Sequence, residues 1–394
     1  MAFDLSRAWA EIDLGVLRGN VRALRDHVGP LVGIAAVVKA DAYGHGLRLV
    51  ARSASEAGAD WLAVATPREA EEAREASPGA AIMVLSPFLP GDAGAVVRAR
   101  ATPLLSNIET ARALSREAIE ADYRLPVHIK VDTGMGRAGV DEASAPAFAR
   151  ALLELEGLEV DGVASQFPSA DTDEGLSRNQ IARLSAVRDA VSRLARRRIV
   201  AHIANSAGIR RYPEGHLDAV RPGLLLYGFS PALAAPDSPV PVEPVMTLKA
   251  RVVLLRHMPA GASISYGGDC VLSRPSKVAM LGIGYGDGYP RRLSGRGAAL
   301  LRGLRARILG RVCMDVTMVD ATDIGGVSVG DEAVLIGRQM GERISVEEIA
   351  RLVQTTEHDI TTRLTSRVVR VPLDRRGLVP ERPPNRGAAG DSAP

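Results

Sequence analysis

The lysine at position 39 ends an unbroken apolar run, in the stretch AAVVKADAYGHG that covers residues 35–46. Lysine is rare in this chain, because only Lys39, Lys130, Lys249 and Lys277 are lysines among its 49 basic residues. Arginine keeps its charge in proteins, whereas a buried lysine can be neutral, nucleophilic or bonded to a carbonyl carbon. A snorkelling surface lysine is the simpler reading of one strand end. A lysine retained here nevertheless indicates covalent chemistry with a carbonyl compound.

The elements that must position Lys39 are visible as short apolar runs that alternate with amphipathic stretches between residues 32 and 228. Eight runs are candidate strands: VGIAAVVKA, WLAVAT, AIMVLSP, ATPLLSN, PVHIKVDT, LEVDGVASQF, IVAHIANS and AVRPGLLLYG. Stretches between them, such as NQIARLSAVRDAVSRLARR, have helical spacing. Eight strand–helix units in about 200 residues match a (β/α)8 barrel, and a doubly wound open sheet is the alternative that periodicity leaves open.

A second domain is indicated by a change in the residue pattern near residue 235. The proline-rich segment APDSPVPVEP is followed by short strands broken by glycine, such as SKVAMLGIGYG and DEAVLIGR, with one capped helix in SVEEIARLV. We therefore expect an α/β chain with a barrel over residues 10–234 and a mostly β domain over 235–373, which residues 1–9 could join. Residues 374–394 are rich in Pro, Gly and Arg, and we expect them to be disordered.

The composition argues against several classes of protein. With 46% apolar and 24% charged residues and a net charge of +3, the chain has the profile of a globular protein and offers no basic block for nucleic acid. Its apolar runs are of strand length, and charges interrupt the N-terminus, so we expect a cytoplasmic protein without membrane contact. Cys270 and Cys313 form no CxxC pair, so we expect ordinary buried thiols and no metal site.

The polar residues of the barrel region fall at one predicted face. In such a barrel the carboxyl ends of the strands form the active face, and there the sequence places Lys39, DTGMGRAG, SQFPSAD, NSAG and RPG. Loops after the seventh and eighth strands often hold a phosphate, and ANSAG and RPGLLLYG supply a hydroxyl and small residues whose N–H groups can approach an anion. A reactive lysine beside a phosphate cradle predicts pyridoxal 5′-phosphate as the cofactor.

Eight motifs then resemble one family, the pyridoxal-phosphate-dependent alanine racemases. They are EIDLGVLRGNV, AVVKADAYGHG, VDTGMGRAG, HIANSAG, RPGLLLYG, SISYGG, IGYGDGYPRR and GRVCMDVTMVD, in sequence order from about Trp9 to Arg370. One such motif is weak, but eight in order across both predicted domains are specific. The resemblance implies a barrel followed by a β domain, a homodimer, and interconversion of L-alanine and D-alanine that supplies D-alanine for peptidoglycan.

The resemblance also implies roles for single residues of the barrel. Lys39 would bond covalently to the cofactor and act as the base on one face of the substrate carbon. Tyr43 and Ser206 would bind the phosphate together with the backbone of Gly223 and Leu224. Tyr43 taken alone could equally be a half-buried packing residue.

The remaining roles concern the cofactor ring, the substrate and the second base. Arg221 would face the pyridine nitrogen, and because a guanidinium keeps its proton, the ring would be a weaker electron sink than one paired with a carboxylate. Tyr266, from the partner subunit, would be the base on the opposite face. Arg137 and the backbone N–H of Met314 would meet the substrate carboxylate, and Lys130 matches a lysine that is often carbamylated and bridges to Arg137. Alone, Arg221 could be a strand-end ion-pair partner and Tyr266 a core tyrosine.

Three positions depart from the family pattern: Gln166 leaves the rate and the pH profile open, and His358 and Ser366 leave the pocket size and the substrate range open. Gln166 stands where a histidine is usual beside the cofactor, His358 where a tyrosine is common, and Ser366 where some members carry a tyrosine. The alternatives are a racemase of another or broader range, such as serine or lysine, a decarboxylase or aldolase on the same barrel, and a cofactor carrier without catalysis. Tyr266 and the whole β domain argue against the last two, which need neither.

Overall fold

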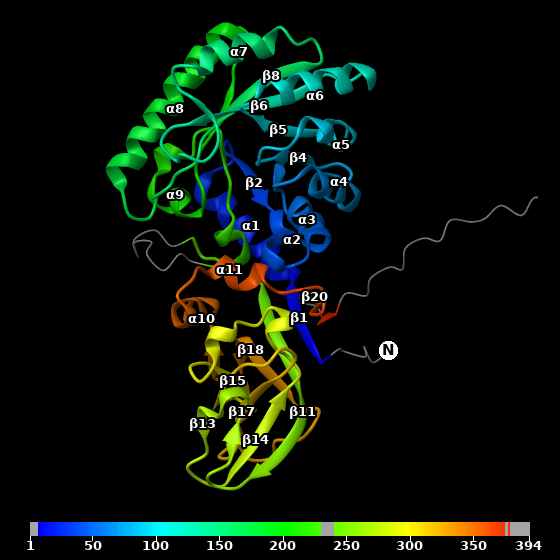
Figure 1. Ribbon diagram of the computed structural model, residues 1–394. Coiled ribbons are helices and arrows are strands. Elements are labelled where there is room, and N and C mark those ends of the chain that lie inside the picture. Colours follow the sequence, from blue (N-terminus) through cyan, green and yellow to red (C-terminus); the bar gives the residue numbers. More distant parts are fainter. Residues whose placement is uncertain (1–6, 230–239, 375–376, 379–394) are drawn as a thin grey trace, which may run out of the picture.

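The structure is a computed structural model, and it describes residues 7–229, 240–374 and 377–378. Figure 1 shows two lobes end to end, a barrel surrounded by helices and a smaller domain made mostly of strands. All eight expected strands of the barrel form: β2 (Gly33–Val37), β3 (Trp61–Val64), β4 (Ala81–Val84), β5 (Ala101–Leu105), β6 (Leu125–Asp132), β8 (Leu158–Ala164), β9 (Val200–His202) and β10 (Ala219–Val220). They pair in parallel, and the pairing of β5 with β6 closes the ring. The closed barrel is confirmed, and the open-sheet alternative is wrong.

Helices cover the outside of the barrel: α1 (Leu14–Val28), α3 (Leu47–Glu56), α4 (Pro67–Ala76), α5 (Ala93–Arg98), α6 (Ile108–Glu120), α7 (Ala145–Leu153), α8 (Glu174–Ala195) and α9 (Ser206–Arg211). Several begin at a polar cap that the sequence encodes. Thr66 and Glu69 form a capping box on α4, and the side chains of Asn107 and Asp173 accept backbone N–H groups of α6 and α8. Each cap fixes where a strand-end loop stops and its helix starts.

The short elements of the barrel lie mainly at its mouth. They are α2 (Lys39–Gly44), β7 (Val140–Asp141) and the 3₁₀ turns η1 (Pro90–Asp92), η2 (Pro213–Gly215) and η3 (Leu224–Tyr227). Among them, α2 and η3 carry residues that the sequence analysis singled out.

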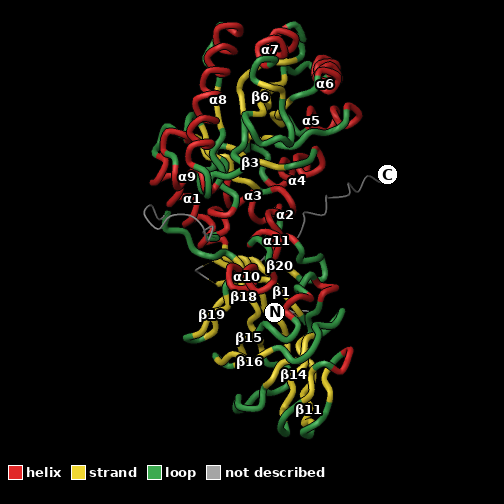
Figure 2. The backbone as a smooth tube through the Cα atoms, turned by 60° about the vertical axis from the view of Figure 1, so that its left-hand side comes forward, coloured by secondary structure: helices red, strands yellow, loops and turns green. Residues whose placement is uncertain are grey.

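The second domain is built on a mostly antiparallel sheet that includes strands from the N-terminal and C-terminal parts of the chain. The N-terminal strand β1 (Ala8–Asp13) pairs antiparallel with β11 (Met246–Met258) and parallel with β20 (Val369–Asp374). Figures 1 and 2 show β1 and β20 side by side at the junction of the two lobes. The segment that joins this sheet from the N-terminus therefore runs to Asp13, whose side chain then caps α1.

The other strands of this sheet are β14 (Ser276–Leu281), β15 (Ala298–Leu301), β16 (Leu304–Arg307), β17 (Thr317–Asp320), β18 (Glu332–Gln339), β19 (Glu342–Ile344) and β21 (Gly377–Leu378), while β12 (Ser263–Ile264) and β13 (Cys270–Val271) pair as a separate two-stranded sheet. The helices and 3₁₀ turns of the domain are α10 (Val346–Val353), α11 (Glu357–Thr362), η4 (Tyr266–Gly268), η5 (Tyr285–Asp287) and η6 (Arg291–Leu293). In Figure 1, α10 and α11 lie between the sheet and the barrel.

Three details differ from expectation or fall outside the described chain. Cys270 and Cys313 are free but only partly buried, so the prediction of buried thiols is wrong; both lie on short segments near the surface of the β domain. Half of the proline-rich segment, residues 235–239, and most of the expected disordered tail, residues 375–376 and 379–394, are outside the described residues; within that tail, Gly377 and Leu378 form β21 against β20. No helix in the described ranges is long and apolar enough to cross a membrane.

Candidate active site

A cavity of about 710 Å³ opens at the carboxyl ends of the barrel strands. Below it, the barrel interior is filled by a small cluster of Ala35, Val37, Ala63, Met83, Leu104 and Ala164. Three of these six side chains are alanine, which leaves room above them for a bound molecule. The predicted barrel residues that line the cavity are Lys39, Tyr43, Lys130, Arg137, Gln166, Ser206, Arg221, Gly223 and Leu224.

Lys39 stands directly after β2, partly buried at the cavity wall. Burial first, and then the positive charge of Arg137 and Arg221, lowers the pKa of the Lys39 ammonium, while Glu69 opposes the shift. A lower pKa makes the neutral amine easier to form, and the neutral amine is the nucleophile toward a carbonyl. The environment therefore suits the covalent role expected of Lys39.

A left-handed turn follows Lys39 and carries Tyr43 into the cavity. In α2 the four residues from Ala40 to Tyr43 have φ of 51–54°, although none is glycine. Such a conformation costs roughly 1–2 kcal/mol per residue, so surrounding contacts must hold it. The Glu69 carboxylate accepts the Ala40 N–H at 2.7 Å, and the Asp41 carboxylate accepts the Leu47 N–H at 2.8 Å.

The buried His45 supports the same turn from below. Its Nδ1 lies 3.0 Å from the carbonyl oxygen of Ala42 and 3.1 Å from that of Tyr43, so Nδ1 carries the hydrogen and donates. Burial lowers the pKa of His45 to about 4, which keeps the ring neutral, and the ring stacks on Tyr227 at 4.3 Å. The turn that presents Lys39 and Tyr43 is thus fixed by hydrogen bonds and by packing.

Three donors meet at Gly223 and fit a phosphate: the hydroxyls of Tyr43 and Ser206 and the backbone N–H of Leu224. Ser206 Oγ accepts the N–H groups of Gly223 and Leu225, each at 3.1 Å, while the N–H of Leu224 has no acceptor in the described part of the chain. A Cβ on residue 223 would lie 2.8 Å from Tyr43 Oη, so glycine lets the phenol approach. Burial raises the pKa of Tyr43 to about 12, which keeps its hydroxyl a donor. These groups form the cradle that the predicted cofactor requires.

Arg221 is buried and held by a chain of hydrogen bonds through the barrel. It donates to His202 Nδ1 at 2.5 Å, to the carbonyl of Ser165 at 2.6 Å and to Gln166 Oε1 at 3.0 Å. A guanidinium can only donate, so His202 must accept at Nδ1, carry its hydrogen on Nε2 and donate to His128 Nδ1, 2.8 Å away. Burial first, and then Arg221, lowers the pKa of His202 well below its usual value and that of His128 to about 4. Both rings are therefore neutral, and the orientation of Arg221 is fixed.

The cavity is strongly positive on its inner side. Burial, and then Arg221 and Arg137, hold the pKa of the Lys130 ammonium well below its usual range, and Lys130 has no ion-pair or hydrogen-bond partner among the described residues. Burial and Arg137 lower the pKa of Arg221 to about 10. Arg137 itself is exposed at the rim. Such a cluster favours anionic ligands, as a phosphate and an amino-acid carboxylate are.

The β domain also lines the cavity, through the segment that leads into α11. Thr355, Thr356, Glu357 and His358 reach the rim, and the His358 ring lies 5.8 Å from that of Tyr43. Of these four, His358 was identifiable from the sequence, whereas Thr355, Thr356 and Glu357 were not, because nothing local marks a β-domain segment as part of a barrel mouth. Ser366 is exposed and is not part of the cavity wall.

Tyr266 and Met314 lie apart from the cavity, on the outer surface of the β domain. They are 69% and 52% exposed, and neither lines the cavity. Their segments touch, because the Ser265 hydroxyl donates to the carbonyl of Arg311 at 2.6 Å and lies 3.4 Å from Cys313 Sγ. We call the exposed surface formed by Tyr266 and Met314 the Tyr266–Met314 face. One chain thus brings together the barrel residues of the expected site but not these two.

Comparison with known proteins covers both lobes. The family model "Alanine racemase, N-terminal domain" matches residues 12–231, and "Alanine racemase, C-terminal domain" matches residues 245–372. The alanine racemases of Halothermothrix orenii and Symbiobacterium thermophilum are each 42% identical to this chain over 363 residues, which is 92% of this chain and 96% of theirs.

Solved structures agree over nearly the whole chain. The alanine racemase of Bacillus anthracis with bound L-Ala-P superposes with a TM-score of 0.89 at 32% identity, covering 96% of this chain and 98% of that one. That of Bartonella henselae, with covalently bound pyridoxal phosphate, gives a TM-score of 0.81 at 31% identity, covering 93% and 100%.

Proposed function

We propose that this chain, which belongs to the alanine racemase family and interconverts L-alanine and D-alanine with pyridoxal 5′-phosphate, uses two acid–base groups from two copies of itself. Lys39 would come from one barrel and Tyr266 from the β domain of the partner in a homodimer. The observation that carries the proposal is their separation within one chain: Lys39 lines the cavity, whereas Tyr266 is 69% exposed outside it. A second copy would supply the missing group.

The residues around the cavity divide the task of holding the cofactor. When bound, pyridoxal 5′-phosphate draws electrons from the substrate α-carbon and so makes its proton removable. Tyr43, Ser206 and the backbone of Gly223 and Leu224 would bind the phosphate, and the amine of Lys39 would bond to the aldehyde carbon with release of water. Arg221, fixed by His202, would donate a hydrogen bond to the ring nitrogen without giving up its proton.

Inversion at the α-carbon requires a proton to leave one face and another to arrive at the opposite face. Lys39, with its lowered pKa, would hold or release a proton on one face, and Tyr266 would do so on the other. Because positive charge beside a phenol stabilises the phenolate, Tyr266 would benefit from a positively charged cavity such as the one around Arg221. In the free chain it is exposed, and the partner's cavity would provide that charge.

The substrate carboxylate would be bound by Arg137 and by the backbone N–H of the partner's Met314. Lys130 would become carbamylated: its neutral amine attacks carbon dioxide, a C–N bond forms, and one proton is released. The product places a negative charge near Arg137 and Arg221. Before the reaction, the positive charges of these two residues disfavour the ammonium form of Lys130. This reaction would turn an unfavourable buried cation into an anion with two cationic neighbours.

The side-chain end of the substrate would face Thr356 and His358 at the cavity rim. Both are polar, and His358 is smaller than the tyrosine expected there from the resemblance. Alanine fits such a site, and serine would be the next substrate to test. We further propose that the enzyme works in the cytoplasm and supplies D-alanine for peptidoglycan.

Mixed dimers test the shared site directly. Lys39→Ala and Tyr266→Phe chains are each inactive as homodimers if every site needs both groups. In a hybrid dimer one site has lost both groups and the other is intact, so the hybrid should have half the activity of the unmodified dimer. Random mixing should recover about a quarter of that activity, because about half of the dimers are hybrids. No recovery from a mixture that demonstrably contains hybrids would contradict the shared site.

A further inference from the structure

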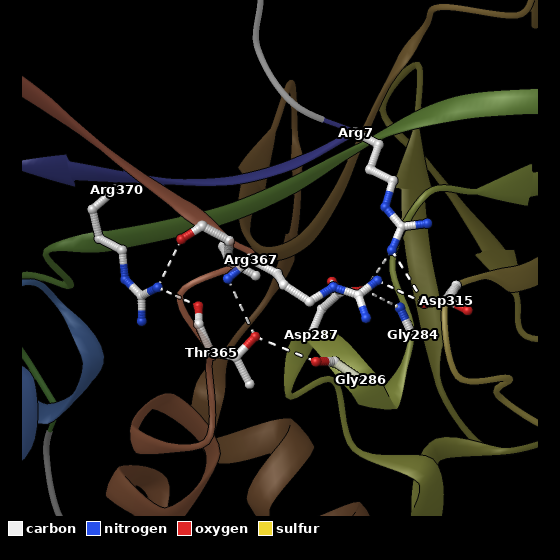
Figure 3. A network of polar contacts seen from close by, with 9 residues as sticks. Arg7, Gly284, Gly286, Asp287, Asp315, Thr365, Arg367 and Arg370 are labelled. Carbon is white, nitrogen blue, oxygen red and sulfur yellow. Dashed lines mark hydrogen bonds and ion pairs between the residues drawn. The ribbon is translucent and has the colours of Figure 1, made fainter.

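Four charged side chains form a compact network, shown in Figure 3, and one of them belongs to Asp315, the residue after Met314. Arg367 spans two carboxylates, with Nε 2.9 Å from Asp287 Oδ1 and a terminal nitrogen 2.6 Å from Asp315 Oδ1. Arg7 lies 3.5 Å from both acids. Asp287 is only 1% exposed, whereas the other three reach solvent. A buried carboxylate must be paired to be tolerated, so these contacts fix its position.

The Asp287 carboxylate organises the loop that precedes it. Its Oδ2 accepts the Gly284 N–H at 2.8 Å, and its backbone carbonyl accepts the Thr365 N–H at 3.1 Å. The loop then grips the neighbouring turn: the Tyr285 N–H donates to the carbonyl of Cys313 at 3.0 Å, and the Gly286 N–H donates to that of Met314 at 2.8 Å.

The approach of these two segments is close. A Cβ on residue 284 would lie 2.3 Å from the carbonyl oxygen of Cys313 and 2.4 Å from that of Met314, so only glycine fits. On the other side of the turn, Arg367 holds Asp315, the residue after Met314. Two backbone hydrogen bonds from the loop before Asp287 and one ion pair to Arg367 therefore hold the turn from Cys313 to Asp315, in addition to the hydrogen bond from the Cys313 N–H to the Val316 carbonyl at 3.0 Å.

The hydrogen bond to the Cys313 carbonyl also fixes the direction of the Met314 N–H. These two groups belong to the same peptide plane, and in a trans peptide they point in opposite directions. With the carbonyl bonded to Tyr285, the N–H points away from the loop, and it has no acceptor within residues 7–229 and 240–374. An unpaired donor fixed on a half-exposed turn is ready to bind an external acceptor.

We infer that Asp287 and Arg367 are positioning residues for substrate binding: they fix the Cys313–Met314 peptide so that its N–H can bind the substrate carboxylate in the partner's site. This inference rests on the proposed function, which assigns the carboxylate to Met314. Neither residue touches the substrate. Their effect should therefore be on binding, with little effect on proton transfer.

The test uses the cofactor-loaded dimer and two variants. Arg367→Gln removes the exposed member of the network, and Asp287→Asn keeps an acceptor for Gly284 but loses the charge. Both should raise KM for L-alanine and D-alanine roughly tenfold and change kcat by less than about twofold, as expected when an interaction common to ground state and transition state is lost. Propionate, which shares only the carboxylate, should lose affinity by the same factor.

Two controls separate positioning from general damage. Asp323→Asn makes the same chemical change in the same domain, where Asp323 pairs with Arg274 on the surface, and it should leave all constants unchanged. The double variant Asp315→Asn with Arg367→Gln should be less impaired than the sum of the two single effects, because both substitutions remove the Arg367–Asp315 ion pair. The visible absorbance of the cofactor should stay the same in every variant.

Hydrogen exchange of residues 284–288 and 313–315 identifies which step fails if the prediction is wrong. Faster exchange together with weaker propionate binding supports the inference. Faster exchange with unchanged propionate binding would overturn it by removing the Met314 assignment of the proposed function. Unchanged exchange and unchanged KM would overturn the network's role and leave the proposed function standing. If Asp287→Asn does not fold, the measurements on Arg367→Gln alone still test whether the network positions the Cys313–Met314 peptide.

Discussion

The barrel mouth and the Tyr266–Met314 face carry the two parts of the expected site under opposite conditions. At the mouth, Arg221 and Lys130 are buried by their own chain, and burial shifts their pKa values. On the face of the β domain, Tyr266 and Met314 are largely exposed. The charged groups at the mouth are thus buried by the fold of a single chain. The groups that would serve a second chain stay exposed until the two chains associate.

The largest loss of racemase activity should come from a substitution at the barrel mouth. Replacing Lys39 by alanine should lower racemisation by at least roughly 10⁴-fold, because both the covalent link to the cofactor and one base are lost. Borohydride reduction of the unmodified protein followed by peptide mapping should find the cofactor on Lys39. The matched control is Lys277→Ala, since Lys277 only donates to the carbonyl of Val327 in the β domain. A label on Lys130 would contradict the assignment.

The next largest loss of activity should come from substituting Tyr266, which tests the role of the Tyr266–Met314 face. Tyr266→Phe should slow racemisation roughly 10²–10⁴-fold in both directions, because inversion needs a proton donor on each face. In deuterated water the variant should still exchange the α-hydrogen of D-alanine with retention, through Lys39, while L-alanine exchanges far more slowly.

The control for this prediction is Tyr123→Phe, which removes a phenol far from both halves of the site and should change neither reaction. Equal loss of exchange from both isomers, with the cofactor still bound, would mean that Tyr266 is not the second base.

The smallest expected effect is on stability, and it arises because Lys130 is buried without a partner among the described residues. Its folded pKa lies well below the ordinary 10.5, first because of burial and then because of Arg221 and Arg137. Between that lowered pKa and the ordinary one, the unfolded chain binds a proton that the folded chain does not, so the free energy of unfolding should rise with pH. One such group gives at most about 1.4 kcal/mol per pH unit. Urea unfolding of the cofactor-free protein in carbon-dioxide-free buffer should show this rise, and Lys130→Met should remove it.

Lys249 supplies the opposite case as a control for the pH series. Burial opposes the shift, but hydrogen bonds to Glu11 and Glu332 raise the pKa of the Lys249 ammonium. Its stabilisation is therefore complete below the ordinary pKa and is lost only as pH rises through the raised value. Lys249→Met should lower stability without changing the slope near neutral pH. Identical slopes for the unmodified protein and Lys130→Met would show that Lys130 is not held as an unfavourable cation.

The barrel could be predicted from the sequence because its signals are local. Each apolar run is a buried parallel strand, and caps such as Asn107 mark the start of the following helix. Lys39 was identifiable because it is one of only four lysines, at a strand end. Ser206 and Gly223 followed from the position of their loops on the barrel. In each case, neighbours in sequence decide the structure.

The remaining features depend on contacts between distant segments. The left-handed turn from Ala40 to Tyr43 contains no glycine, so local preference argues against it; it is held in part by Glu69 and by the Thr361 backbone, which leaves no room for a Cβ on residue 44. The place of His358 at the cavity rim likewise depends on how the two lobes pack. Cys313 was expected in the core because cysteine is usually buried, but it lies in the turn beside Met314.

The strand β1 has a consequence for the order in which the molecule is made. Ala8 pairs with Ala250, and Trp9 pairs with Val369, so β1 is synthesised well before either of the strands that pair with it. The barrel strands, from residue 33 to residue 220, can meet much earlier. We expect the barrel to form during translation, with β1 waiting as an unpaired strand edge that other chains could capture. Both β11 and β20 must be synthesised before the two edges of β1 are paired.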